Sequence, residues 1–221
     1  MFAVIFEVQP RQGRFDDYLA LAKELKPKLE AIDGFIDNER FRSLRDERRV
    51  LSLSVWRDEK ALIRWRTQGD HHGVQEKGRF EVFEDYHLRV GEIFADSKAT
   101  PAKQQRFDET EVGASKAVSL IEVEPSGKHG VASETLAAQL GLASGDTGVT
   151  GHETFESITA PGKLLLLMSW RSVAEAEDFS PKSAPGAKIL RHRSVRIIRD
   201  YGMFERREAP QFYPEARRAS Q

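Results

Sequence analysis

The chain has 221 residues, 39% of them hydrophobic and 31% charged, which suits one large domain or two domains of about 100 residues. Its 34 basic and 35 acidic residues leave a net charge of −1, so no overall charge attracts it to nucleic acid. Cysteine is absent, which excludes disulfides, thiolate metal sites, iron–sulfur clusters and a cysteine nucleophile.

The N-terminal segment 3–9 predicts a strand, because it is rich in β-branched and aromatic residues and is followed by Pro10 and Gly13. Its apolar run is short and is interrupted by Glu7, with no basic segment before it. It is therefore neither a signal peptide nor a membrane span, and we expect a cytoplasmic protein without a membrane partner.

A helix is predicted to begin at Phe15, because apolar residues then recur at a spacing of about 3.6 as far as Ile32. Asp33-Gly34 ends this pattern. Pro27 lies inside the helix, where we expect it to kink the helix or to start a new turn.

Two strands follow at 35–44 and 49–57, joined by a charged turn. In the second strand, alternation sends Leu51, Leu53 and Val55 to one face and Ser52, Ser54 and Trp56 to the other. A second helix is predicted from about Asp58, a suitable N-cap, and a last strand at 80–94. Residues 1–96 therefore have the order β-α-β-β-α-β.

Residues 115–207 repeat this order. Strands are predicted at 116–124, 148–158, 163–171 and 187–205, and helices at 130–141 and 172–179, the latter shortened by Pro181 and Pro185. The polar segment 97–114 is interpreted as a linker, and residues 208–221 as a C-terminal tail.

Four pairs of short motifs support a duplication. Glu7-Val8, Phe41-Arg42, Trp56-Arg57 and Asp85-Tyr86 resemble Glu122-Val123, Phe155-Glu156, Trp170-Arg171 and Asp200-Tyr201, at offsets of 114 or 115 residues. We therefore predict an α+β protein of two ferredoxin-like βαββαβ repeats. Their antiparallel sheets pack face to face as an intramolecular α+β barrel that encloses a cavity.

Residues 1–96 resemble the antibiotic biosynthesis monooxygenase (ABM) family of the dimeric α+β barrel superfamily. The resemblance rests on Val55-Trp56-Arg57, the following Asp-Glu-Lys-Ala-Leu, Trp65, Asp70-His71-His72 and Gln75. The second half resembles the family only in outline. Members of this family include quinone-forming oxygenases and haem-degrading oxygenases.

The resemblance implies that Trp65 lines a substrate or haem pocket, although a large aromatic residue at this position equally suits core packing. His71 and His72 are adjacent and so point about 100° apart on a helix. One of them could transfer protons or bind haem iron, or both could lie in solvent at the helix end. The separation of seven residues between Trp65 and His72 predicts that both project from one side of a single helix.

Asn38, Arg40, Ser52 and Ser54 lie on or next to the central strands. They could orient a planar substrate or stabilise an enolate, or they could lie in water at strand ends. Tyr86 could donate a proton, but its match to Tyr201 favours a structural role. We predict His72, Trp65 and Asn38 as the catalytic residues, in an apolar pocket between the sheet and the second helix of the first half.

We expect a cofactor-independent monooxygenase that deprotonates a small aromatic or quinone-like substrate and passes an electron from its anion to O₂. The alternatives are a non-catalytic binding module for an apolar ligand and a haem-binding or haem-degrading protein. The first strand lacks the asparagine of the haem-degrading relatives, so haem is not favoured. No histidine spacing predicts a metal site, and the chain is expected to be a monomer or homodimer.

Overall fold

The computed structural model describes residues 1–126, 135–143 and 145–214, apart from the side chains of Asp70 and His71. Within these residues, no helix is both long and apolar enough to cross a membrane.

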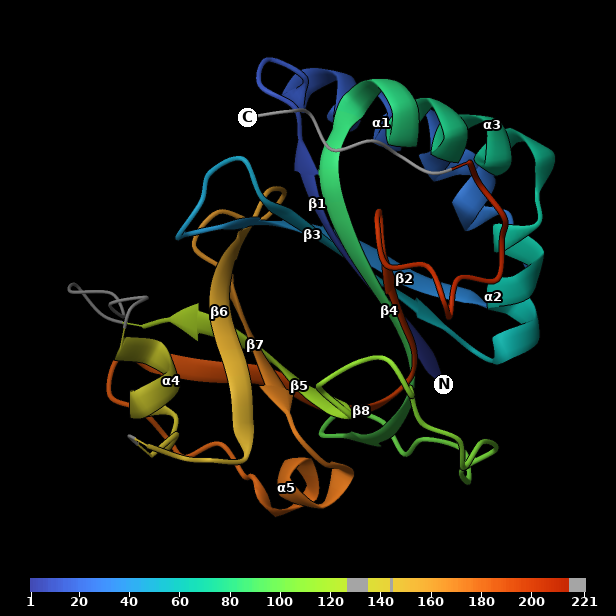
Figure 1. Cartoon of the computed structure of the whole chain (residues 1–221). Coiled ribbons are helices and arrows are strands. Elements are labelled where there is room, and N and C mark those ends of the chain that lie inside the picture. Colours follow the sequence, from blue (N-terminus) through green and yellow to red (C-terminus); the bar gives the residue numbers. More distant parts are fainter. Residues whose placement is uncertain (127–134, 144, 215–221) are drawn as a thin grey trace.

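Eight antiparallel strands form one closed barrel, in the order β1-β3-β2-β6-β7-β5-β8-β4 (Figure 1). Their bounds are β1 Phe2–Pro10, β2 Phe35–Ser43, β3 Val50–Trp56, β4 Phe83–Asp96, β5 Ala117–Pro125, β6 Val149–Ser157, β7 Leu164–Trp170 and β8 Ala187–Gly202. Each half contributes four strands in the ferredoxin-like arrangement, which confirms the predicted α+β fold of two repeats.

Two junctions close the barrel between the repeats. At one junction, β2 pairs with β6 over a short stretch, from Phe41 opposite Ser157 to Ser43 opposite Phe155. At the other, β4 pairs with β8 along most of its length, from His87 opposite Gly202 to Asp96 opposite Arg193. The two sheets of the predicted intramolecular barrel are therefore joined to each other by hydrogen bonds at both junctions.

Apolar side chains from both repeats fill the middle of the barrel. They include Leu51, Leu53 and Val55 of β3 together with Ala3, Ile5, Phe41, Ile93, Val118, Leu120, Phe155, Leu165, Leu167, Val195 and Ile197, all at most 4% exposed. The expectation that the sheets enclose a cavity was therefore wrong for this region, because large aliphatic and aromatic side chains occupy the space.

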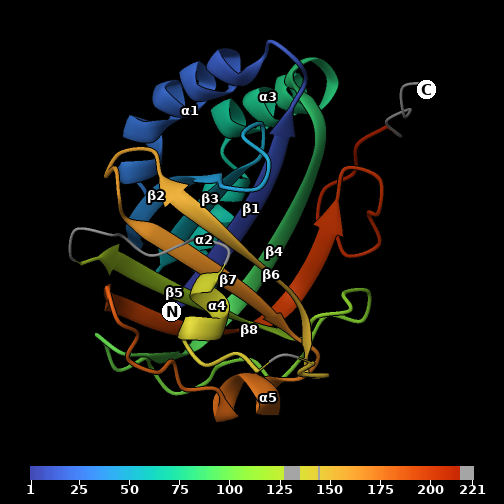
Figure 2. The same cartoon turned by 90° about the vertical axis from the view of Figure 1, so that its left-hand side faces the viewer.

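The helices lie outside the barrel, on the outer faces of the two repeats (Figures 1 and 2). Repeat 1 carries α1 Phe15–Glu30, α2 Glu59–Arg66 and α3 Gly69–Lys77, followed by a π-helical turn, η1 Gly78–Val82. Repeat 2 carries only the short α4 Leu136–Gln139 and α5 Val173–Asp178 among its described residues. Residues 130–134 of the predicted helix lie outside the described residues.

The second helix of repeat 1 is in fact two helices, which corrects the prediction of one. Asp58 caps α2 as expected, since its Oδ1 accepts from the Ala61 amide at 2.8 Å. The Thr67 hydroxyl then donates to the Ile63 carbonyl, and Gln68 adopts an extended backbone before α3 begins. Because of this break, Trp65 and His72 do not share one helical face. By contrast, α1 continues through Pro27 to Glu30.

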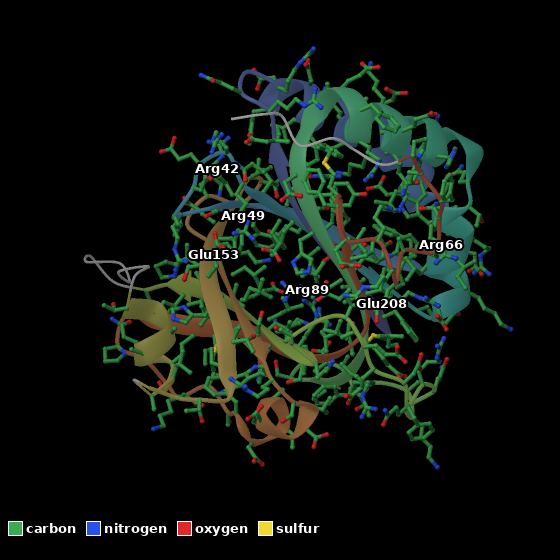
Figure 3. All side chains as sticks on the ribbon, in the orientation of Figure 1. Arg42, Arg49, Arg66, Arg89, Glu153 and Glu208 are labelled. Carbon is green, nitrogen blue, oxygen red and sulfur yellow. The ribbon has the colours of Figure 1, made fainter. Side chains whose placement is uncertain are left out.

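A buried ionic network centres on Glu7 of β1, and Figure 3 labels three of its other members, Arg49, Arg89 and Glu153. Glu7, which is 4% exposed, binds Arg89 at 2.6 Å and Arg49 at 2.8 Å. Arg49 also binds Glu153 of repeat 2 at 3.0 Å, and Glu153 accepts a hydrogen bond from Ser43. The network therefore joins the two repeats across the β2–β6 junction.

A second network repeats this arrangement with the halves exchanged. Glu122 binds Arg193 at 2.6 Å and Lys163 at 2.8 Å. Lys163 binds Glu39 of repeat 1 at 2.6 Å, and Glu39 accepts from the Ser157 hydroxyl at 2.7 Å. Glu7 and Glu122 thus hold equivalent positions, which the offset of 115 residues predicted.

The fourth repeat motif was a chance match. Tyr86 of β4 lies opposite Val8, whereas the residue opposite the equivalent Val123 is Ile189 and not Tyr201. The connection between the last two strands is shorter in repeat 2, because β8 begins 17 positions after Trp170 whereas β4 begins 27 positions after Trp56. Equal sequence offsets therefore do not give equal positions in β4 and β8. Residues 97–114 contain no helix or strand.

Candidate functional site

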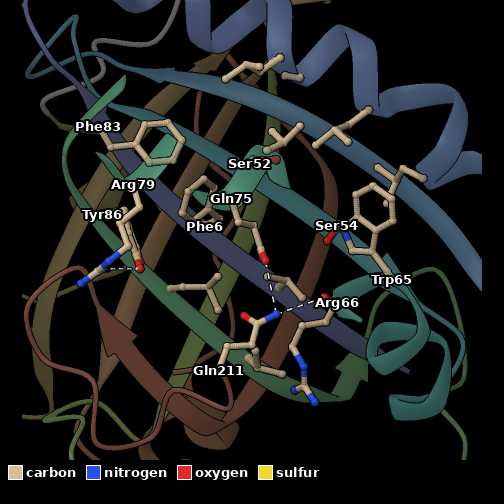
Figure 4. A pocket seen from close by; sticks show the side chains of 18 of the residues that line it. Phe6, Ser52, Ser54, Trp65, Arg66, Gln75, Arg79, Phe83, Tyr86 and Gln211 are labelled. Carbon is tan, nitrogen blue, oxygen red and sulfur yellow. Dashed lines mark hydrogen bonds between the residues drawn. The ribbon is translucent and has the colours of Figure 1, made fainter. Parts of the chain in front are cut away.

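A pocket of about 200 Å³ lies outside the barrel, between the outer face of the repeat-1 sheet and the helices α1, α2 and α3 (Figure 4). This pocket therefore lies between the sheet and the helices, where the sequence predicted an apolar pocket, and not inside the barrel. Apolar side chains line most of it: Val4, Phe6, Leu21, Ala22, Leu25, Leu29, Leu62, Trp65, Val74, Phe83, Leu88 and Val90.

The sheet side of the pocket carries a polar strip from β2 and β3. Asn38 donates from Nδ2 to the Ser52 hydroxyl at 3.1 Å and to the Leu53 carbonyl at 3.0 Å. The Leu53 contact fixes the orientation of the amide, because a carbonyl can only accept. The Asn38 Oδ1 has no hydrogen-bond partner among the described residues, so it is available to a ligand.

Two further groups adjoin this strip. Ser54 accepts from the Trp56 indole at 3.0 Å, which leaves its own proton free. Burial raises the pKa of Tyr18, and the Arg40 guanidinium and Ser52 hydroxyl beside it offset this only in part. Tyr18 is therefore a neutral phenol near pH 7 and acts as a hydrogen-bond donor.

The predicted catalytic residues do not all meet in this pocket. Trp65 and Asn38 line it. His72 does not: its side chain is exposed, its ring stacks on Tyr213, and its Nδ1 lies 3.1 Å from the Tyr213 hydroxyl. The side chain of His71 lies outside the described residues.

Residues after β8 cover one side of the pocket, and the sequence did not predict this. Gln211 donates from Nε2 to the Arg66 carbonyl at 3.1 Å and to Gln75 at 3.3 Å, and Tyr213 donates to Gln75 at 3.1 Å. These residues belong to the segment interpreted as a tail. The aromatic pair Phe212-Tyr213 within a polar segment was a signal that could have indicated docking.

Three side chains form a cationic cluster at the same side. The hydroxyl oxygen of Tyr86 accepts from Arg206 at 2.7 Å and from Arg79 at 3.1 Å. Arg79 is 2% exposed and also donates to the Met203 carbonyl at 2.8 Å. Both guanidiniums lie over the Tyr213 ring, with their central carbons at 5.8 Å and 5.4 Å from its centroid.

The charge of the lining is entirely positive among the described residues. Four arginines contribute to it, namely Arg40, Arg66, Arg79 and Arg206, and no aspartate, glutamate or lysine does. Within the described chain, none of the four has a carboxylate oxygen within 4.0 Å. Arg79 is buried and the other three are half-buried. A buried cation without counter-charge is costly, so this pocket is suited to an anion.

The described lining contains no imidazole, so it offers haem iron no histidine ligand. The described residues also contain no group of three histidine, aspartate or glutamate side chains that could hold a metal ion.

Comparison with known proteins gives one match to the first repeat and another to almost the whole chain. Residues 1–77 match the model of the antibiotic biosynthesis monooxygenase family. A protein of Pyricularia oryzae named "Jasmonate monooxygenase ABM" is 44% identical over 224 aligned positions, covering 98% of this chain and all of the relative.

Solved structures resemble the chain in fold alone. Aldoxime dehydratase is 8% identical with a TM-score of 0.52, covering 89% of this chain and 80% of that one. An anthrone oxidase-like protein is 14% identical with a TM-score of 0.36, covering 95% and 96%.

Proposed function

This chain belongs to the antibiotic biosynthesis monooxygenase family, and we propose that it oxidises a small amphipathic organic acid in the outer pocket of repeat 1. The observation that carries the proposal is the lining, which combines apolar walls with four arginines and no described acidic residue. An apolar body with one anionic group matches both features. A jasmonate is such a molecule, with a cyclopentanone, an apolar chain and a carboxylate, and the fungal relative is named for it.

The polar strip on the sheet supplies groups for the reacting end of the substrate. The Ser52 and Tyr18 hydroxyls and the Arg40 guanidinium can donate to an enolate or phenolate oxygen, and Asn38 Oδ1 can accept from a hydroxyl. Donors held in place before reaction stabilise the charge that develops on oxygen. Trp65 then forms an apolar wall beside this end.

The proton balance follows from the same lining. No described carboxylate or imidazole lines the pocket, so a proton leaving the substrate goes to water. The arginines favour the anion that remains, because an opposite charge nearby lowers the pKa of a bound acid. A phenol or an enolised dicarbonyl can ionise in this way more readily than a simple ketone.

Two possible products differ in the number of electrons that a reductant must supply. Oxidation of a CH₂ group to a carbonyl by one O₂, with release of one water, needs no other reductant. Conversion of C–H to C–OH releases the second oxygen atom as water only if a reductant supplies two electrons. We propose the first, cofactor-independent course for substrates that ionise, and a reduced nicotinamide or flavin as the donor for any hydroxylated product.

The test is oxygen consumption and product mass with jasmonate and a panel of acidic phenols, in heavy-oxygen O₂, with and without a reduced nicotinamide or flavin. We expect one labelled oxygen atom in the product. Asn38→Ala should lower kcat, while Asp37→Ala, an exposed neighbour on the same strand, should leave it unchanged. The proposal fails if no substrate of the panel gains oxygen, or if both variants behave alike.

A further inference from the structure

The geometry points to Arg206 and Arg79, with the Tyr86 hydroxyl between them, as the site that binds the carboxylate of the substrate. This inference rests on the proposed function but concerns a different step, namely recognition of the anionic end. It places a specificity-determining residue, Arg206, in the segment after β8, outside the region 1–77 that matches the family.

The hydrogen bonds at Tyr86 leave donors free. Its oxygen accepts from both guanidiniums, so its own proton is not used by either. Arg79 uses three N–H groups, toward Tyr86, Met203 and Pro214, and Arg206 uses three, toward Tyr86, Gly202 and Gln211. Since a guanidinium has five N–H groups, two remain without an acceptor on each arginine among the described residues.

The unused N–H groups of Arg79 matter because this residue is buried and cannot donate them freely to water. Arg79 is 2% exposed, and its Nε is a buried atom without a hydrogen-bond partner. Every described acceptor of the two guanidiniums is neutral, either a carbonyl or a phenol oxygen. Two like charges on one hydroxyl repel each other, and a carboxylate placed there would relieve the repulsion and use the free N–H groups.

The position of the cluster also orients the substrate. Arg79, Phe83 and Tyr86 lie on one side of the pocket, and Trp65 and Ser54 on the other (Figure 4). Arg79 and Arg206 also line a second cavity, of about 580 Å³, beneath the segment after β8. A carboxylate at the cluster therefore lies where the two cavities meet, and the apolar body extends toward Trp65 and the polar strip.

The segment after β8 is held firmly enough to serve this purpose. The Glu208 carboxylate accepts from the Thr110 hydroxyl at 2.7 Å and from the Asp200 amide at 2.6 Å. Burial works against ionisation of Glu208, but these donors and two more backbone amides outweigh it and lower its pKa. The carboxylate stays charged at neutral pH and fastens the segment to β8 and to residues 110–112.

The experiment compares binding of an acid and its neutral ester. Jasmonate and methyl jasmonate, and cinnamate and methyl cinnamate, are titrated into the full-length protein while tryptophan fluorescence is followed. Trp65 reports on the pocket, because the other tryptophans, Trp56 and Trp170, lie at most 2% exposed in the core. The wild-type chain should bind each acid more tightly than its ester.

Arg206→Gln should weaken binding of the acids about 10- to 100-fold, as loss of a charged hydrogen bond does, and should change ester binding less than about twofold. Arg206→Lys should recover part of the acid preference. Arg207→Gln is the matched control, because Arg207 is 73% exposed and binds only Glu205 among the described residues.

Three outcomes would overturn the inference. They are no acid preference in the wild-type chain, an equal loss of acid and ester binding in Arg206→Gln, or a selective loss in Arg66→Gln and not in Arg206→Gln. If the acids bind as expected but none is oxidised, the recognition site stands and the proposed function fails. If jasmonate is oxidised and Arg206→Gln retains the acid preference, the proposed function stands and this inference fails.

Discussion

Replacement of Glu7 by glutamine should cost this barrel a large part of its stability. Glu7 is 4% exposed and binds Arg89 at 2.6 Å and Arg49 at 2.8 Å. Burial by itself would raise its pKa, but Arg89, His87 and Arg49 together lower the pKa from 4.5 to about 2. A carboxyl group with a lowered pKa stabilises the folded state when it is ionised.

The magnitude follows from that shift. A change from 4.5 to about 2 corresponds to roughly 3–4 kcal/mol at about 1.4 kcal/mol for each pKa unit. Removing one partner of a buried ion pair costs about 3–5 kcal/mol, because the other charge remains buried. We therefore expect Glu7→Gln to lower the free energy of unfolding by about 3 kcal/mol near neutral pH.

Urea unfolding followed by tryptophan fluorescence measures this loss. The stabilisation is complete above about pH 4.5 and is lost as the pH falls through about 2, so the difference between variant and wild type should shrink over that range. Glu124→Gln is the control, because Glu124 is 59% exposed and lies 3.8 Å from Lys188. It should change stability by less than about 0.5 kcal/mol. A loss for Glu7→Gln no larger than the control, or one independent of pH, would refute the reasoning.

Two other predictions concern the β4–β8 side of the barrel. Gly91→Ala should destabilise the fold by about 1–3 kcal/mol, because its new Cβ would lie 2.2 Å from the Arg196 carbonyl oxygen. Gly151→Ala has open space and should be neutral in the same urea assay; equal effects would contradict the packing argument. Burial lowers the pKa of His87, but the hydrogen bond to Asp200 and the nearby Glu7 carboxylate outweigh it and raise the pKa above 6.5. Its contribution is complete below about pH 6.5 and is lost as the pH rises through the raised value, so His87→Gln should flatten stability over that range. An unchanged pH profile would exclude this contribution.

The sequence predicted those features that depend on local alternation. Alternation on 49–57 predicted that Leu53 and Ser52 face opposite sides of the strand, and the structure places Leu53 in the barrel core and Ser52 at the outer pocket. The offset of 115 residues correctly paired Glu7 with Glu122, which hold equivalent positions in the two ionic networks. Both results follow because each strand has a fixed period of two and each repeat keeps its register at these strands.

The rest of the site could not be predicted, because it depends on contacts between distant segments. Gln211 reaches Arg66 across 145 residues, and Arg79 reaches Met203 across 124. Neither segment has a periodic pattern, and prolines with scattered charge are also typical of a free tail. The break between α2 and α3, which moves His72 away from the pocket, depends on the short sequence Thr67-Gln68-Gly69.

The topology of the barrel explains why the pocket and the cationic cluster lie in repeat 1. In repeat 2, α4 and α5 pack directly on the sheet, and Leu136 and Leu140 are fully buried there. In repeat 1, the long α1 and the separate α2 and α3 leave the pocket between themselves and the sheet.

Antiparallel pairing of β8 with β4 then places Gly202 opposite His87, and the Met203 amide donates to the Tyr86 carbonyl at 3.0 Å. The chain therefore leaves repeat 2 beside Tyr86, and Arg206 follows after a few residues. Repeat 1 by itself has no chain at this position. The duplication thus does more than close the barrel within one polypeptide, because the end of the second repeat supplies a cation to the pocket of the first.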